Sequence, residues 1–306
     1  MELRDWALIT FTILAQMSVG AFWVLGIIHY FATRKAGVEE ADRMSDRALL
    51  AIIPVLVLGM LASLLHLGNP FNAYKAVTNF GSSWLSREVL FGVLFLVFGA
   101  LYAFLQWRKI GSVAMRNVLA WIAALIGFVL VYSMSRIYML YSQPAWNTLA
   151  TPISFFVTTL LLGALAMGAA IAWNYAQVQK KNPECADVQC EMMRTTLRWV
   201  AIAGVVLLGI ELVVFPIYLS TLATGNPAAI ASLRMMASNF GLVFALRLIL
   251  VFVGAGVFGL FLYQNASSAG QEKVLSNMAY SAFVLVFVAE VMGRFLFYVT
   301  HQGVGL

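Results

Sequence analysis

Eight long runs of apolar residues, separated by short polar segments, organise the 306-residue chain. A helix needs roughly 20 apolar residues to cross about 30 Å of hydrocarbon, and each run has about that length. The runs cover residues 7–31, 47–66, 87–107, 117–141, 149–175, 197–220, 240–263 and 275–299. The pattern predicts an all-α integral membrane protein with eight transmembrane helices, which form a single domain over residues 1–306.

The composition supports this interpretation, because 62% of the residues are hydrophobic and only 10% are charged. A polypeptide of that composition cannot provide the polar surface of a water-soluble protein. The first run does not look like a cleavable signal peptide, since it is long, no small-residue cleavage site follows it, and its flank contains Glu2, Arg4 and Asp5. We therefore expect it to remain as the first spanning helix.

The basic residues predict the orientation in the membrane. Most of the 19 Lys and Arg residues fall in or beside the segments 32–46, 108–116, 176–196 and 264–274. Positively charged loops are retained in the cytoplasm, so these segments are predicted to be cytoplasmic and both termini periplasmic. The net charge of +6 is thus explained by topology. It does not indicate a nucleic-acid partner.

The connection 67–86 is predicted to lie on the outer side and to contain a short helix. Asn69 is a typical N-cap with Pro70 at the first helical position, and Gly81 is a typical stop. The apolar residues between them recur every three positions, which favours a helix lying in the membrane interface.

The same connection brings two groups that can handle protons to a similar depth. His66 ends the second apolar run, and Glu88 begins the third. Arg87 is the only counter-charge adjacent to Glu88 in sequence, and it points about 100° away on an ideal helix. We therefore expect Glu88 and His66 to have a functional role.

Charged side chains inside apolar runs cost a few kcal/mol or more unless they are paired or face a polar cavity. The sequence has three acids and three bases of this kind, which favours an ion-paired network: Glu88, Arg136, Glu211, Arg247, Glu290 and Arg294. Glu290 and Arg294 have the i, i+4 spacing that favours a pair on one helix. Glu211 and Arg247 are predicted to pair across two helices.

The histidines and cysteines are the residues that could ligate a haem or a metal ion. His66 and His301 could in principle ligate a b-type haem, but His301 falls beyond the last apolar run, so no haem is expected. His29 lies at the cytoplasmic interface and needs no further role. Cys185 and Cys190 are expected to be free thiols, because two ligands do not make a zinc or iron–sulfur site and the cytoplasm is reducing. No metal is expected on the chain.

The aromatic turn 138–147 fits either an interfacial belt or the entrance for a quinone head group. An arginine followed by aromatic residues closes both the fourth run, at Arg136 to Tyr138, and the eighth, at Arg294 to Tyr298. This similarity suggests two four-helix halves.

Three motifs resemble the membrane anchor subunit of anaerobic dimethyl sulfoxide reductases: residues 66–70 (HLGNP), 81–88 (GSSWLSRE) and 290–298 (EVMGRFLFY). The resemblance implies a haem-free and metal-free anchor in the bacterial inner membrane. Such an anchor does not itself catalyse the terminal reduction. It binds menaquinol near the periplasmic face and passes electrons to an iron–sulfur subunit, and from there to a molybdopterin catalytic subunit. The implied quinol site, with Glu88 and His66 as its catalytic pair, is His66, Ser86, Arg87, Glu88, Arg136 and Tyr138.

Two other classes fit parts of the pattern. A proton-coupled secondary transporter would also carry intramembrane acids and bases, although it would typically have broken helices at mid-membrane. A haem b-containing quinol oxidoreductase anchor is the other alternative. The terminal electron acceptor and the quinone type are left open by the sequence.

Overall fold

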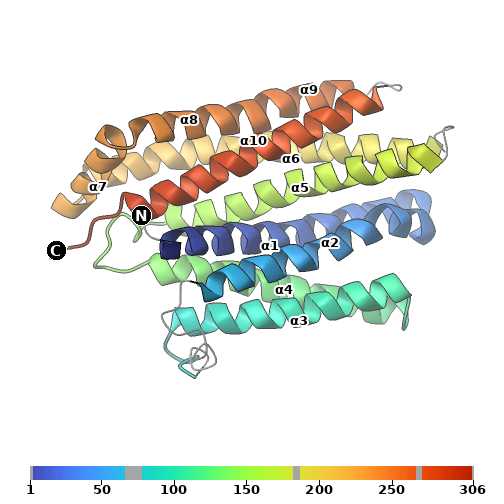
Figure 1. Ribbon diagram of the computed structural model, residues 1–306, viewed down its shortest axis with the longest axis horizontal. Coiled ribbons are helices and arrows are strands. Elements are labelled where there is room, and N and C mark those ends of the chain that lie inside the picture. Colours follow the sequence, from blue (N-terminus) through green and yellow to red (C-terminus); the bar gives the residue numbers. More distant parts are fainter. Residues whose placement is uncertain (1–2, 66–77, 182–186, 267–270, 305–306) are drawn as a thin grey trace.

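A computed structural model describes residues 3–65, 78–181, 187–266 and 271–304, and these ranges consist of helices joined by turns and contain no strand (Figure 1). The elements are α1 (Leu3–Ala36), α2 (Val38–Leu64), α3 (Trp84–Arg108), α4 (Val113–Tyr138), α5 (Ala150–Lys181), α6 (Asp187–Ala223), α7 (Pro227–Ser238), α8 (Gly241–Val251), the π-helix η2 (Phe252–Val257), α9 (Phe258–Asn265) and α10 (Glu272–Val299).

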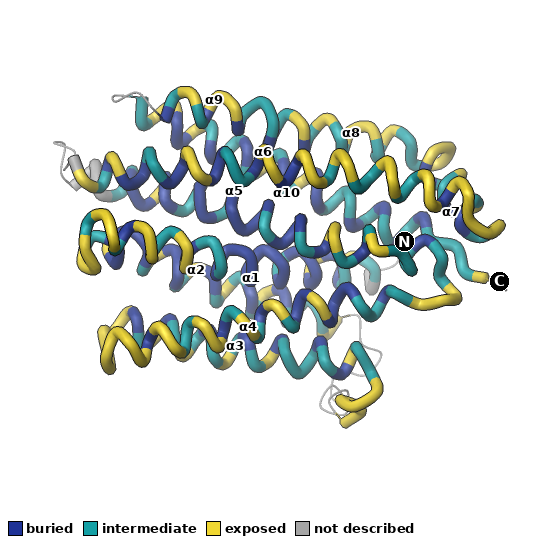
Figure 2. Tube along the Cα trace, turned by 180° about the vertical axis from the view of Figure 1, so that it is seen from behind, coloured by how far each residue is buried: buried dark blue, intermediate teal, exposed yellow. Residues whose placement is uncertain are grey.

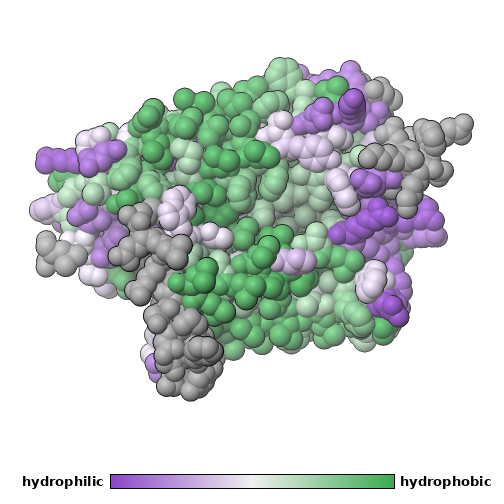
Figure 3. Space-filling view, in the orientation of Figure 1, coloured by the Kyte–Doolittle hydropathy of each residue, from purple (hydrophilic) through white to green (hydrophobic). Residues whose placement is uncertain are grey.

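Eight helices in the described ranges are long and apolar enough to span a membrane. The seventh is the continuous run Gly241–Asn265, which comprises α8, η2 and α9. A hydrophobic band covers the middle of the molecule, and hydrophilic residues gather at its two ends (Figure 3). The eight spans predicted from the apolar runs are thus confirmed.

The spans lie side by side along the long axis as two groups of four (Figures 1 and 2). Helices α1 to α4 form one half, and α5, α6, α8–α9 and α10 form the other. Both termini lie at the same end of the bundle, which we call the terminal end (Figure 1). That this end faces the periplasm remains a prediction from the distribution of Lys and Arg.

Helices α1 and α5 cross at the centre of the bundle and join the two halves. They approach so closely that a Cβ on Gly20 would lie 1.8 Å from the carbonyl oxygen of Thr159, and one on Gly163 would lie 2.2 Å from the carbonyl carbon of Gly20. Small residues permit such close backbone packing in membranes. One turn away, Gln16 Nε2 donates a 2.7 Å hydrogen bond to the carbonyl oxygen of Phe155.

Helices extend beyond the apolar runs at the end opposite the termini. The segment 32–46 is almost entirely helical, because α1 ends at Ala36 and α2 begins at Val38. Gly37 alone separates them, with a φ of 87° that a glycine adopts without steric cost. The buried Ala41 and Met44 hold the polar start of α2 against the bundle.

One short helix was predicted from the sequence at the terminal end, and another, α7, is found there in the structure. The predicted interfacial helix falls mostly in 66–77, which lies outside the described residues. Helix α7 was not predicted. It starts with Pro227 at its first position, and the Asn226 side chain accepts a 3.0 Å hydrogen bond from the backbone nitrogen of Ala229.

Candidate functional site

The start of α3 places three of the predicted quinol-site residues at the terminal end of the bundle. Ser83 caps the helix by accepting a 3.3 Å hydrogen bond from the backbone nitrogen of Ser86. Helix α3 therefore begins at Trp84, and Ser86 and Glu88 both face inward from its first turns and are buried. His66 lies outside the described residues, so its position relative to Glu88 stays a prediction.

Arg87 points away from Glu88, as its sequence position indicated. Its guanidinium donates hydrogen bonds of 3.0 and 2.8 Å to the carbonyl oxygens of Phe80 and Gly81. It also lies 4.2 Å from the centroid of the Trp84 ring. Arg87 thus fixes the turn that precedes α3 and does not neutralise the carboxylate.

The Glu88 side chain is only 5% exposed. Within the described residues, no ion pair or hydrogen bond to its carboxylate is found. A buried charge without a partner is costly, and such groups are concentrated where a protein binds or transfers something. Glu88 is therefore the strongest candidate for chemistry in this half of the bundle.

Arg136 and Tyr138 end α4 and lie on the same side of the bundle as the start of α3. The Arg136 guanidinium lies 5.4 Å from the Trp84 ring, so Trp84 is in contact with two cations. Arg136 also donates to the Met139 sulfur at 3.3 Å, while its Nε has no partner among the described residues.

Tyr138 forms a buried hydrogen bond with Tyr298, with 2.7 Å between the two hydroxyl oxygens. The bond joins α4 to α10 and therefore connects the two halves. Tyr298 belongs to the third family-like motif but was not predicted as a site residue, and its place beside Tyr138 adds it to the candidate site.

The aromatic turn after α4 packs on the same tyrosine. Trp146 lies edge-on to Tyr138, with ring centroids 5.2 Å apart, and stacks on His301 at 4.1 Å. His301 Nδ1 lies 2.6 Å from the carbonyl oxygen of Tyr298. Aromatic rings thus pack together at the terminal end of the bundle. His301 packs against Trp146 there.

One of the two predicted ion pairs is confirmed and the other is wrong. Glu211 of α6 pairs with Arg247 of α8. Glu290 and Arg294 form no direct pair, although their spacing allows one. Thr158 donates a 2.6 Å hydrogen bond to Glu290. The Arg294 guanidinium turns to α1, where Nη2 donates to Gln16 Oε1 at 2.6 Å. Glu290 and Arg294 therefore bind residues on neighbouring helices, Thr158 and Gln16, instead of each other.

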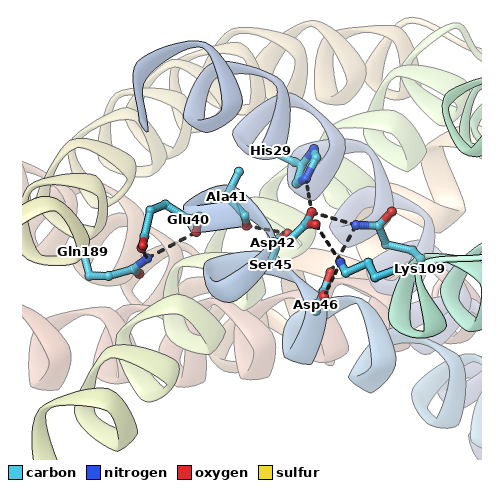
Figure 4. Close-up of polar contacts among 9 residues, drawn as sticks. His29, Glu40, Ala41, Asp42, Ser45, Asp46, Lys109 and Gln189 are labelled. Carbon is cyan, nitrogen blue, oxygen red and sulfur yellow. Dashed lines mark hydrogen bonds and ion pairs between the residues drawn. The ribbon is translucent and has the colours of Figure 1, made fainter. Parts of the chain in front are cut away.

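The end opposite the termini carries a polar cluster that the sequence did not predict (Figure 4). Asp42 is its centre: His29 Nε2 lies 2.8 Å from Asp42 Oδ1, and Lys109 Nζ donates to Asp42 Oδ2 at 2.7 Å. Lys109 also contacts Asp46 at 2.7 Å, and Gln106 donates to Asp42 at 2.7 Å. His29 is therefore part of a network that ties α1, α2 and α3 together, contrary to the expectation that it needs no further role.

Replacing Asp42 with alanine is expected to destabilise the protein by roughly 1–3 kcal/mol, because His29 and Gln106 lose an acceptor in a buried site. The measurement is the thermal unfolding midpoint of the detergent-solubilised complex. Glu39→Ala is the matched control, since its pair with Arg43 is exposed and should contribute less than about 1 kcal/mol. Equal midpoints for the two variants would contradict a structural role for the Asp42 cluster.

The cysteine prediction is wrong for the residue that the structure describes. Cys190, near the start of α6, is in a disulfide instead of being a free thiol, and Cys185 lies outside the described residues. Within the described residues, no group of three or more His, Cys, Asp or Glu side chains could hold a metal ion.

Eight apolar spans, with charged and polar side chains buried between them, define a multi-pass integral membrane protein. The protein belongs to the family described as DMSO reductase anchor subunit (DmsC), which it matches over residues 1–300. It is therefore a membrane anchor of a molybdoenzyme complex that also contains catalytic and electron-transfer partners, and its spans are consistent with the bacterial inner membrane.

Relatives support the same assignment over the whole sequence. An anaerobic dimethyl sulfoxide reductase chain of Haemophilus influenzae is 27% identical, over 99% of this sequence and 97% of that protein. An anaerobic dimethyl sulfoxide reductase chain of Escherichia coli is 26% identical over the same shares. A sulfite dehydrogenase subunit of Allochromatium vinosum is 27% identical over 56% of this sequence and 54% of its own length.

Proposed function

We propose that this anchor oxidises menaquinol at the terminal end of α3 and α4. Oxidation breaks the two O–H bonds of the quinol, so that two protons and two electrons leave and a quinone remains. The carboxylate of Glu88 takes one proton and the imidazole of His66 takes the other. The electrons pass to an iron–sulfur subunit and then to a molybdopterin subunit that reduces the terminal acceptor.

The observation that carries this proposal is the burial of Glu88 without a partner in the part of the chain that the structure describes. A quinol hydroxyl would supply the hydrogen-bond donor that the carboxylate lacks among the described residues. Ser86 contributes a buried hydroxyl on the same helix turn. The Arg136 guanidinium, which lies over Trp84, and the Tyr138 hydroxyl would position the head group from the α4 side.

The partners are proposed to dock at the terminal end, on the periplasmic side. The anchor is proposed to hold neither haem nor metal, so the quinol must lie within electron-transfer distance of a cluster in the iron–sulfur subunit. The connection 67–86 ends in the first turn of α3, and it is the part of the anchor that we expect to contact that subunit.

Purification by a tag on this anchor tests the proposal. Iron and molybdenum are expected to accompany it, and the purified complex is expected to accept electrons from a menaquinol analogue. The anchor purified apart from its partners is expected to show no haem Soret absorption. A Soret band, or metal-free preparations of an otherwise intact complex, would favour a haem-containing anchor or a transporter instead.

A further inference from the structure

A cavity of about 110 Å³ lies in the second half of the bundle, away from α3 and Glu88. Its walls come from α5, α6, α8 and α10, and Met236 of α7 borders it. Ala150 and Thr300 also line it, and both lie at the terminal end of their helices. Glu290 lies ten residues before Thr300, so the cavity reaches roughly 15 Å into the bundle at 1.5 Å per helical residue.

The innermost lining residues are charged. Arg247 donates to Glu211, and its Nη2 lies 3.7 Å from Glu290 Oε1. One guanidinium therefore faces two carboxylates, which leaves this group of three with one excess negative charge. Arg294 lies on the same wall, but it donates to Gln16 and packs 3.8 Å from the Phe155 ring centroid.

A glycine makes room for this arrangement. A Cβ on Gly293 would lie 2.4 Å from Arg247 Nε and 2.9 Å from its Cζ. The guanidinium therefore crosses directly over the backbone of α10 and reaches Glu290 from the neighbouring helix α8. The position of Arg247 between two carboxylates thus depends on packing against α10 as well as on charge.

Four buried polar atoms at this end of the cavity have no hydrogen-bond partner among the described residues: Glu211 Oε2, Glu290 Oε1, Arg247 Nε and Arg294 Nε. Glu290 is 3% exposed and Arg294 is 6% exposed. The group presents two acceptors and two donors. Water satisfies both kinds, and the volume is well above the ~10–15 Å³ that one water molecule requires.

We propose that this cavity is a water-filled proton-exchange site, in which Glu290 takes up and releases one proton from the aqueous phase at the terminal end. A hydronium ion in the cavity gives its proton to a Glu290 oxygen and remains as water; release is the reverse step. The proposal is independent of quinol oxidation at Glu88. It gives the second half of the bundle a proton site of its own.

Charged and polar groups from the surrounding helices face Glu290. Thr158 of α5 donates to it, and Arg247 of α8 lies 3.7 Å from its Oε1. Glu211 of α6 shares Arg247, and Arg294 of α10 lines the same cavity. Tyr218 of α6 lines the same cavity.

Dicyclohexylcarbodiimide tests the proposal in the intact complex, because it reacts with protonated carboxyl groups in apolar surroundings. The expected product is a modified Glu290 peptide, identified by mass spectrometry, whose yield falls at least tenfold from acidic to alkaline pH. Glu290→Gln should abolish the modification of that peptide. Thr158→Val should extend the labelling to higher pH, because it removes the hydroxyl that donates a hydrogen bond to the carboxylate.

Thr159→Val is the matched control. Its hydroxyl donates to the carbonyl oxygen of Phe155 at 2.7 Å and accepts from Gln16 Nε2 at 3.3 Å, and neither contact involves Glu290, so the pH profile of labelling should not move. A Glu290 that stays unmodified at every pH, or whose labelling does not change with pH, overturns the proposal. The pH dependence of Glu290 labelling is measured on the wild-type complex, so the test does not require any variant to fold.

Discussion

Replacing Glu88 by glutamine is expected to lower menaquinol-dependent turnover of the complex by roughly 10²-fold or more, the usual contribution of a positioned proton acceptor. Glutamine has nearly the same size and still fits the buried position, but its amide cannot take the proton of a quinol hydroxyl. The assay compares reduction of the terminal acceptor by a menaquinol analogue with reduction by an artificial dye that feeds electrons to the partners directly.

The artificial-donor rate should stay unchanged, because it bypasses the anchor. Glu88→Asp keeps a carboxylate and should retain more quinol-dependent activity than the glutamine variant. His66→Ala is expected to lose quinol-dependent turnover in the same way. Quinol-coupled rates close to wild type in both Glu88→Gln and His66→Ala would reject the proposed site, whereas a parallel loss of dye-driven activity would indicate failed assembly.

Replacing Gly163 by alanine is expected to cause a large loss of stability. The new Cβ would lie 2.2 Å from the carbonyl carbon of Gly20 and 2.5 Å from the nitrogen of Ala21. Both are backbone atoms, so no change of rotamer relieves the contact, and α1 and α5 must move apart. Overpacking of this kind costs about 3 kcal/mol or more.

Thermal unfolding of the purified complex measures this effect. Gly26→Ala is the matched control, because it lies in α1 and its Cβ would have no atom within 4 Å. We expect that control to unfold at or slightly above the wild-type temperature, since alanine favours a helix. If Gly163→Ala unfolded at the same temperature as Gly26→Ala, the close crossing of α1 and α5 would be wrong.

The spans could be predicted from the sequence because an apolar run of about 20 residues has only one way to satisfy its backbone in a membrane. The ends of the helices were harder to predict from the sequence. The start of α2 is polar, so its hydropathy does not distinguish a helix that continues beyond the membrane from a loop. Helix α7 carried the same Asn-Pro start signal that was used at Asn69, and Asn226 could have revealed it.

The site was only partly predictable, because side-chain partners come from several helices. Sequence spacing favoured a pair between Glu290 and Arg294. In the structure Glu290 instead accepts a hydrogen bond from Thr158, and Arg294 donates one to Gln16, both on other helices. Gln16 was overlooked because it carries no charge. The Asp42 cluster was missed because the second span was predicted to begin at residue 47, which left Asp42 in a loop.

The crossing of α1 and α5 also makes the two four-helix halves depend on each other. Each four-helix half uses its most buried helix as the surface that meets the other half. Separated from its counterpart, the first half would expose Gln16 and a glycine notch to lipid, where an amide has few hydrogen-bond partners. The two halves are consequently expected to be stable in the bilayer only when they are packed together.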